Sequence, residues 1–262
     1  MRWLTFPVLV PIGPLRVHPH TVFDLLAYSI GFRVFLWQRR RRGDTIDTRA
    51  RWTVVAAAIF GAALGSKVLF WLENPAETLA HWNDPVFLFG GKTIVGGLIG
   101  GLIAVELEKR WSGLTRRTGD LFAMPLAVGI AIGRIGCFLS GLADRTYGTP
   151  SSLPWAVDFG DGIPRHPTQL YESVVMTAAA IVLGRLTWRP HREGDVFKLF
   201  MVMYFALRLV VDAIKPEVRV LLGLSSLQWA SVAVLLYYGH DVRRWIREGW
   251  TSVGSTTGGS AN

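Results

Sequence analysis

The stretch from Gly133 to Glu172 reads GRIGCFLSGLADRTYGTPSSLPWAVDFGDGIPRHPTQLYE and determines how the rest of the chain is interpreted. It places Arg134 directly after the apolar run Leu121–Ile132, with no acidic residue close by in the sequence. A charged side chain at such a depth in a membrane is costly and marks a polar, functional interior. The polar groups that follow therefore predict a functional site near the end of an apolar helix.

The composition is that of a membrane protein. Half of the 262 residues are hydrophobic, only 18% are charged, and the mean hydropathy is +0.32, whereas a soluble domain carries about a quarter charged residues. The net charge of +9 comes from short basic clusters between apolar runs. That pattern is typical of cytoplasmic loops that face anionic lipid headgroups. Because no nucleic-acid-binding motif accompanies the clusters, we expect a membrane and no nucleic acid as partner.

Seven apolar runs are candidates for membrane spans of about 17 to 25 residues, although the third and the seventh are short. Basic residues concentrate after the first, third, fifth and seventh runs, so the positive-inside rule places the N-terminus outside and the C-terminus inside. The predicted fold is all-α, a polytopic membrane protein with seven transmembrane helices. Residues 1–250 form its single transmembrane domain, 141–166 a small outer cap loop, and 251–262 a disordered tail. The runs are Thr21–Trp37, Trp52–Trp71, Thr93–Leu107, Leu121–Leu139, Leu170–Leu186, Val196–Ile214 and Leu227–Tyr238.

Two arginines are predicted to lie at the same depth. Arg134 follows the start of its run by about 13 residues and Arg208 by about 12, which at about 1.5 Å per residue puts both roughly 18–20 Å from the inner surface. This level predicts a shared anion site, the alternative being that each arginine snorkels or pairs locally. Asp212 lies four residues after Arg208, on the same helical face. It either neutralises that guanidinium or holds it toward a phosphate, and the two roles are compatible.

The segment RHPTQLYE opens the fifth run. Pro167 suits the first helical position, which would make His166 the helix cap and Gln169 its capping-box partner. Capping does not explain Tyr171 and Glu172, and Glu172 is either a site residue or half of a structural pair. His166 is likewise either a general base or a cap.

Three further features have open interpretations. Lys92, within GGKTIVGGLIGG, lies at the outer end of its run, where it meets an anionic headgroup or serves as an ordinary interfacial lysine. The paired glycines indicate close helix approach. Cys137 is the only cysteine, which excludes an internal disulfide, and it is either a nucleophile or a small apolar filler. Without HExxH or a comparable ligand spacing, we expect no metal and no cofactor.

The chain resembles the bacterial prolipoprotein diacylglyceryl transferases in GRIGCFLSG, YGTPSSLPWAV, HPTQLYE and ALRLVVD, with the glycine-rich segment ahead of them. The resemblance implies a multi-pass enzyme of the bacterial inner membrane. Such an enzyme transfers the diacylglyceryl group of phosphatidylglycerol to the lipobox cysteine of a prolipoprotein, and glycerol phosphate leaves. By motif, Arg134 and Arg208 correspond to the family's essential arginines, and Asp212 to a glutamate.

Besides Asp212, the chain departs from the family at three positions, and the family's first-span tyrosine motif is not recognisable in HPHTVFD. The family's histidine before the paired glycines is Val95 here, its asparagine after GRxG is Cys137, and its glutamate is Leu142, with Asp144 two residues on. Alternatives are glycerolipid transfer to a different acceptor and a non-catalytic protein that binds anionic lipid. The expected catalytic residues are Arg134, Arg208, Asp144, His166 and Glu172, and the expected lipid contacts are Arg134, Arg208, Lys92, Asp212, Gln169 and Tyr171.

Overall fold

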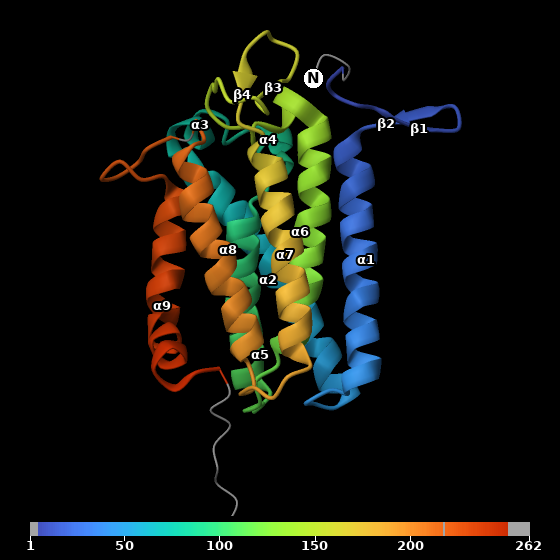
Figure 1. Ribbon diagram of the computed structural model, residues 1–262, viewed down its shortest axis with the longest axis vertical. Helices are drawn as coiled ribbons and strands as arrows, with labels where there is room; N and C mark the ends of the chain where they lie inside the picture. Colours follow the sequence, from blue (N-terminus) through green and yellow to red (C-terminus); the bar gives the residue numbers. More distant parts are fainter. Residues whose placement is uncertain (1–4, 217, 251–262) are drawn as a thin grey trace, which may run out of the picture.

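Seven long helices run side by side along the long axis of the molecule in a computed structural model that describes residues 5–216 and 218–250 (Figure 1). The predicted disordered tail, 251–262, lies outside the described residues. Each helix has 18 residues or more, enough to cross about 27 Å at 1.5 Å per residue. They are α1 Pro19–Arg42, α2 Thr48–Glu73, α5 Ile94–Trp111, α6 Asp120–Ser140, α7 Thr168–Thr187, α8 Asp195–Ala213 and α9 Ser226–Glu248.

Each of the seven predicted apolar runs lies within one of these helices or extends at most one residue beyond it, so the helical state of the runs is confirmed, although α1, α2, α5 and α9 continue for several residues past their runs. Three segments are long and apolar enough to cross a membrane by length and composition: Thr48–Glu73, Asp120–Asp144 and Thr168–Thr187. Large apolar side chains also point away from the bundle, as Phe60 of α2 and Leu236 of α9 do with 71% and 76% exposure. Hydrocarbon accepts such a surface, whereas water does not. The chain is thus an all-α membrane protein.

The short elements gather at one end of the bundle, which we call the cap end. They are the helices α3 Pro75–Ala80 and α4 Pro85–Gly90, the 3₁₀ turn η1 Gly141–Asp144, and two antiparallel hairpins (Figure 1). One hairpin pairs β1 Val10–Ile12 with β2 Leu15–Val17, and the other pairs β3 Val157–Asp158 with β4 Pro164–Arg165. These strands are not predicted from the sequence, because each has only two or three residues.

An aromatic cluster fixes the cap end to α6. Phe138 near the end of α6 contacts Phe159 of the β3–β4 hairpin and Phe6 of the N-terminal segment, with ring centroids 5.8 Å and 5.6 Å apart. Both pairs meet edge to face, the arrangement that aromatic rings prefer. The hairpin therefore lies directly over the end of the helix that carries Arg134.

Side chains cap several of the helices, but α6, α7 and α8 have no side-chain cap. Thr93 caps α5 by accepting a hydrogen bond from the Gly96 amide, and Ser225 forms a capping box with Gln228 at the start of α9. The capping box predicted for α7 is wrong. That helix begins at Thr168 after Pro167, and no side chain caps it. His166 and Gln169 therefore do not cap α7.

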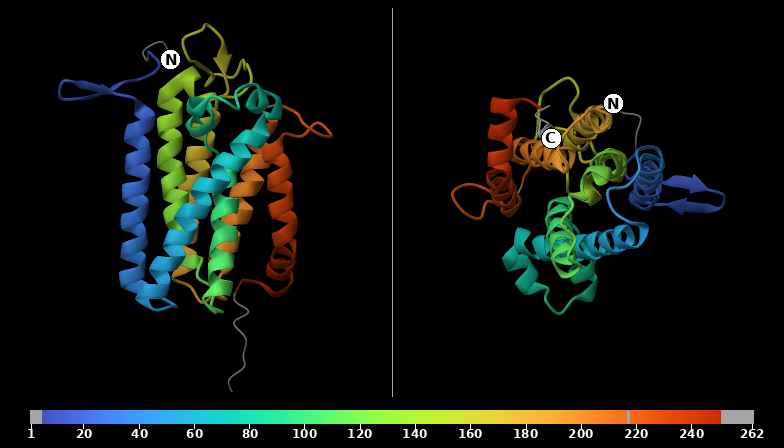
Figure 2. Two further views of the ribbon diagram at one scale, coloured as in Figure 1. Left: turned by 180° about the vertical axis from the view of Figure 1, so that it is seen from behind. Right: turned by 90° about the horizontal axis from the view of Figure 1, so that it is seen from below.

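α6 lies in the middle of the bundle, where it packs against α1, α7 and α8 (Figure 2). The core between α7 and α8 is built from fully buried side chains that include Met176, Phe200, Tyr204 and Phe205. Within lipid, close packing and interhelical hydrogen bonds hold helices together, because hydrocarbon removes the hydrophobic driving force. The polar residues on α6, α7 and α8 therefore lie within a tightly packed group of three helices.

Glycines set the close approach of α2 and α5, as the sequence predicted. A Cβ atom added at Gly100 would lie within 3.0 Å of the Gly61 carbonyl oxygen and the Gly65 Cα atom. Gly96 meets the Gly65 carbonyl oxygen in the same way. Backbone atoms of the two helices are thus in direct contact, and no side chain fits between them.

We expect the Gly100→Ala substitution to lower the thermal unfolding temperature in detergent, because the new methyl group forces the two backbones apart. Overpacking of this kind costs about 1–3 kcal/mol. Gly97→Ala is the matched control, since the nearest atom to its new Cβ is at an ordinary contact distance of 3.6 Å. Equal unfolding temperatures for the two variants would contradict the glycine contact.

Candidate functional site

Glu172 is the centre of a buried ionic cluster. Its carboxylate lies 2.7 Å from Arg134 Nη2 and 3.2 Å from Arg208 Nη1. Lys215 Nζ donates to the same carboxylate at 3.0 Å. These cations come from α6, from α8 and from the segment after α8, so Glu172 joins three parts of the bundle. Because both arginines bind one carboxylate, the prediction that they lie at the same level of the bundle is confirmed.

Asp212 is the second anion of the cluster. Its Oδ1 lies 2.7 Å from Arg208 Nη2, which confirms the predicted shared face of α8, and 3.8 Å from Lys215 Nζ. The ionised cluster then has three cations and two carboxylates, which leaves one positive charge in excess. All five side chains are at most 6% exposed. A buried excess charge is costly unless an anion compensates it.

Several polar atoms beside the cluster have no hydrogen-bond partner among the described residues. The donors among them are Nε of both arginines, the Gln169 amide nitrogen and the Tyr204 hydroxyl, and the acceptors are the Gln169 amide oxygen and both carboxylate oxygens of Asp212. Gln169 precedes Glu172 by one turn of α7, and Tyr204 precedes Arg208 by one turn of α8. A buried polar group without a partner costs about 1–3 kcal/mol. These donors suit an anion with several acceptor oxygens.

The predicted residues His166 and Tyr171 form a separate group under the cap. The Tyr171 hydroxyl accepts a hydrogen bond from Trp155 Nε1 at 2.7 Å and lies 3.3 Å from His166 Nδ1. Neither residue has a hydrogen bond to the ionic cluster in the described part of the chain. In the same hairpin the Arg165 guanidinium lowers the pKa of Asp161 to about 2. This ion pair closes the loop between β3 and β4.

A second polar chain links Lys92 to Asp144 across α1. Lys92 pairs with Asp24, whose Oδ2 lies 3.7 Å from His20 Nδ1, and His20 in turn pairs with Asp144. Cys137 borders both polar groups, because its Sγ lies 3.9 Å from His20 Nε2 and 4.0 Å from Arg134 Nη1. The surroundings of this cysteine are therefore more polar than those of an apolar filler.

The two positions where the resemblance predicts ionisable groups are apolar here. Val95 is 1% exposed and belongs to the hydrophobic core. Leu142 packs against the Phe138–Val157–Phe159 cluster. Neither position offers a proton acceptor to the ionic cluster.

Sequence reasoning missed three functional candidates. Lys215 lies three residues beyond Asp212, a spacing that could have suggested it, but it follows the predicted span. Tyr204 lies within the predicted apolar run Val196–Ile214, four residues before Arg208. His20 precedes Asp24 by four residues, and only the packing of α1 on α6 brings it to Asp144.

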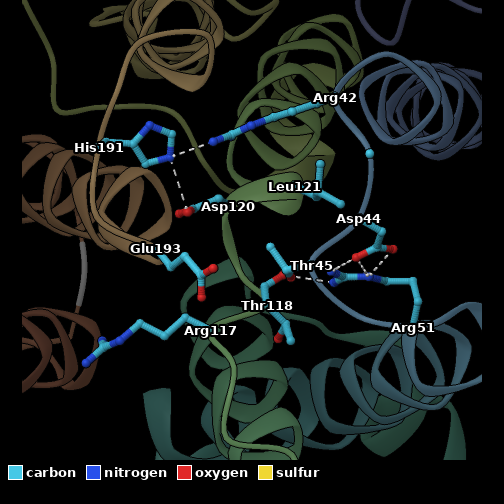
Figure 3. A pocket seen from close by; sticks show the side chains of 11 residues that line it. Arg42, Asp44, Thr45, Arg51, Arg117, Thr118, Asp120, Leu121, His191 and Glu193 are labelled. Atoms are coloured by element: carbon cyan, nitrogen blue, oxygen red, sulfur yellow. Dashed lines mark hydrogen bonds and ion pairs between the residues drawn. The ribbon is translucent and has the colours of Figure 1, made fainter. Parts of the chain in front are cut away.

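Another polar cluster lies at the opposite end of the bundle around a cavity of about 130 Å³ (Figure 3). Arg51 pairs with Asp44 and donates to the Thr118 carbonyl at 2.9 Å. His191 lies 3.4 Å from Asp120, whose carboxylate raises the pKa of the imidazole. Together with the contact of Arg42 Nη2 to His191 Nε2 at 3.1 Å, these contacts tie α1, α2, α6 and the α7–α8 loop together, so the cluster has a structural role at that end.

Comparisons with known proteins show the family to which the chain belongs. The family model described as prolipoprotein diacylglyceryl transferase matches residues 7–239. A phosphatidylglycerol–prolipoprotein diacylglyceryl transferase of Bordetella parapertussis is 34% identical over 88% of this chain and 91% of its own length. Proteins of the same name from Methylobacillus flagellatus and Nitratidesulfovibrio vulgaris are 32% and 31% identical, over 88% and 89% of this chain and 92% and 91% of their own lengths. The chain belongs to the prolipoprotein diacylglyceryl transferase family.

Proposed function

We propose that this protein transfers the diacylglyceryl group of phosphatidylglycerol to the lipobox cysteine of prolipoproteins. The observation that carries the proposal is the excess positive charge of the buried cluster around Glu172, in a chain of this family. Phosphatidylglycerol carries one negative charge on a phosphodiester, which matches that excess. Nothing in residues 5–216 and 218–250 favours another acceptor or a purely lipid-binding role.

We further propose that all seven long helices cross the bacterial inner membrane, with the N-terminus outside and residues 1–250 as one transmembrane domain. The fold supports this, because the basic segments lie together at the end opposite the cap, where the positive-inside rule puts the cytoplasm. The cap end, including residues 141–166, then faces outward. The basic residues are Arg39, Arg40, Arg41, Arg42, Arg49, Arg51, Lys109, Arg110, Arg116, Arg117, Arg185, Arg189, Arg192, Arg243, Arg244 and Arg247.

In this mechanism the lipid phosphate binds between Arg134 and Arg208. Guanidinium groups hold phosphate oxygens through paired, charge-assisted hydrogen bonds. Glu172 and Asp212 fix the angle of the two forks, and Lys215 keeps the site positive. The unpartnered Gln169 amide supplies a neutral donor to the same anion.

The reaction joins the acceptor sulfur to the glyceryl carbon next to the phosphate. As the carbon–sulfur bond forms, the carbon–oxygen bond to the phosphate breaks, and its electron pair leaves with glycerol phosphate. Arg134 and Arg208 stabilise the growing negative charge on that leaving group. His166 and Asp144 stay the proposed groups for proton transfer, and Lys92 and Tyr171 the proposed lipid contacts, since all four lie at the cap end.

We expect Arg134→Ala and Arg208→Ala each to lower transfer at least about 100-fold, the usual effect of removing a group that stabilises transition-state charge. Lys215→Met should also lower the rate, because it removes the excess positive charge. The assay uses phosphatidylglycerol vesicles and a fluorescent lipobox peptide, and it follows both peptide mass and glycerol phosphate release.

Arg116→Ala is the matched control, because Arg116 is 57% exposed at the opposite end of the bundle. Thermal unfolding confirms that each variant is folded. Arg134→Lys serves as a second variant, since it keeps the charge but loses the fork. Wild-type rates in the folded arginine variants would contradict the phosphate site, and glycerol phosphate release without peptide modification would show a different acceptor or hydrolysis.

The proposed orientation has its own test in a Cys137→Ala background. We expect a membrane-impermeant maleimide to label Ser152→Cys in intact spheroplasts, because Ser152 is exposed in the cap loop. Thr45→Cys, exposed in the α1–α2 turn, should be labelled only after permeabilisation. The reverse pattern would invert the topology.

A further inference from the structure

Three different metal-ligating side chains meet beside the phosphate site. They are His20 at the start of α1, Cys137 in the last turn of α6 and Asp144 in η1. One ligand atom of each lies within 4.8 Å of the other two. It is the one group of its kind in the part of the chain that the structure describes. The sequence spacing could not reveal it, because His20 lies 117 residues before Cys137.

The distances and burial suit a small tetrahedral cation. Zinc bonds of about 2.0–2.3 Å place neighbouring ligand atoms roughly 3.3–3.8 Å apart. Cys137 Sγ is 3.9 Å from His20 Nε2, and the direct His20–Asp144 contact would open by a rotamer adjustment. Cys137 is 8% exposed, and the Asp144 and His20 side chains are 6% and 28% exposed. The site is thus buried, with access through the imidazole side.

The ligand types point to zinc among the common divalent ions. One sulfur and one imidazole nitrogen disfavour magnesium and calcium, which prefer oxygen ligands. A thiolate and a carboxylate together neutralise the two charges of Zn²⁺, so the occupied site adds no net charge to the buried cluster. Binding would replace the direct His20–Asp144 contact and release the thiol proton of Cys137.

The contacts that neighbouring residues make with His20 and Asp144 also resemble those around metal ligands. A ligating histidine commonly presents its other nitrogen to a carboxylate, which fixes the ring. Here His20 Nδ1 faces Asp24 at 3.7 Å, and Lys92 holds Asp24 from the other side. Thr146 donates a hydrogen bond to the second oxygen of Asp144. The two carboxylates, Asp24 behind His20 and Asp144 itself, are therefore each oriented by a neighbour.

We propose that His20, Cys137 and Asp144 bind Zn²⁺ and that the acceptor thiol of the substrate takes its fourth position as a thiolate. This inference rests on the proposed function. Three protein ligands and an open position are the arrangement of a catalytic zinc site, and a thiol that coordinates zinc is deprotonated. Arg134 Nη1 lies 4.0 Å from Cys137 Sγ, so metal and phosphate would be neighbours.

The step balances without an oxidant or reductant. On coordination the acceptor thiol gives its proton to water and its sulfur becomes the nucleophile, so Asp144 serves here as a zinc ligand and not as a proton-transfer group. The sulfur then forms the bond to the glyceryl carbon while the carbon–oxygen bond to phosphate breaks. The electron pair leaves with glycerol phosphate, and zinc keeps its charge throughout. The metal would do the work of a proton-accepting histidine, a residue that this chain replaces by Val95.

The first experiment measures metal binding by the full-length protein in detergent. After chelator treatment and reloading with zinc, we expect close to one zinc ion per chain. Affinity should fall at least about tenfold in Cys137→Ala and in His20→Ala. His81→Ala is the matched control, a histidine at the cap end outside the cluster. Cobalt in place of zinc should give a thiolate-to-metal charge-transfer band in the wild type and none in Cys137→Ala.

Absence of that band in the wild-type protein would overturn the metal site, even if a variant failed to fold. Activity then separates the two proposals. We expect chelator-treated protein to lose peptide modification and to regain it with zinc but not with magnesium. Wild-type rates in metal-free protein would overturn the zinc inference while the transferase function stands. Zinc-loaded protein that modifies no peptide would overturn the transferase function, while the cobalt spectrum still decides the metal site.

Discussion

The buried carboxylate of Glu172 is the constraint on which the rest of the structure depends. Each of the three cations around it would be prohibitively costly alone within a membrane. Together they are tolerable only because α6, α7 and α8 pack closely enough to bring Arg134, Arg208 and Lys215 to one acid. Loss of that acid would leave like charges facing one another, so packing and function rest on the same contact.

The charge balance around Glu172 explains why the cluster is suited to an anionic lipid. A structural ion pair balances its charges, whereas this cluster has one cation more than it has carboxylates. Its unpartnered donors, on Gln169 and Tyr204, belong to the same helices. A rigid aromatic contact between Phe138 and the β3–β4 hairpin closes the end above them. The fold thus places excess positive charge and unpartnered hydrogen-bond donors at one level of the bundle, beneath the β3–β4 hairpin.

Most of the fold and part of the site could be predicted from the sequence. Apolar runs and helix rise were enough to place all seven helices and to align Arg134 with Arg208, because both quantities depend on local sequence alone. The rotation of each helix about its own axis does not depend on local sequence alone, so the neighbours of Cys137 and His20 could not be predicted. The predicted capping box failed at Gln169 for a related reason, since its side chain lies in the first turn of α7 but is fully buried and makes no capping hydrogen bond. Whether the helices span a bilayer in the predicted direction stays a prediction.

The most direct test of the central claim is a high-resolution structure of the protein in nanodiscs of phosphatidylglycerol. The expected result is a lipid phosphate with oxygens about 2.7–2.9 Å from both the Arg134 and Arg208 guanidinium groups, the length of a charge-assisted hydrogen bond. A lipid-occupied structure with the headgroup elsewhere, for instance on Lys92, and with both arginines bound only to Glu172 and Asp212, would contradict the claim.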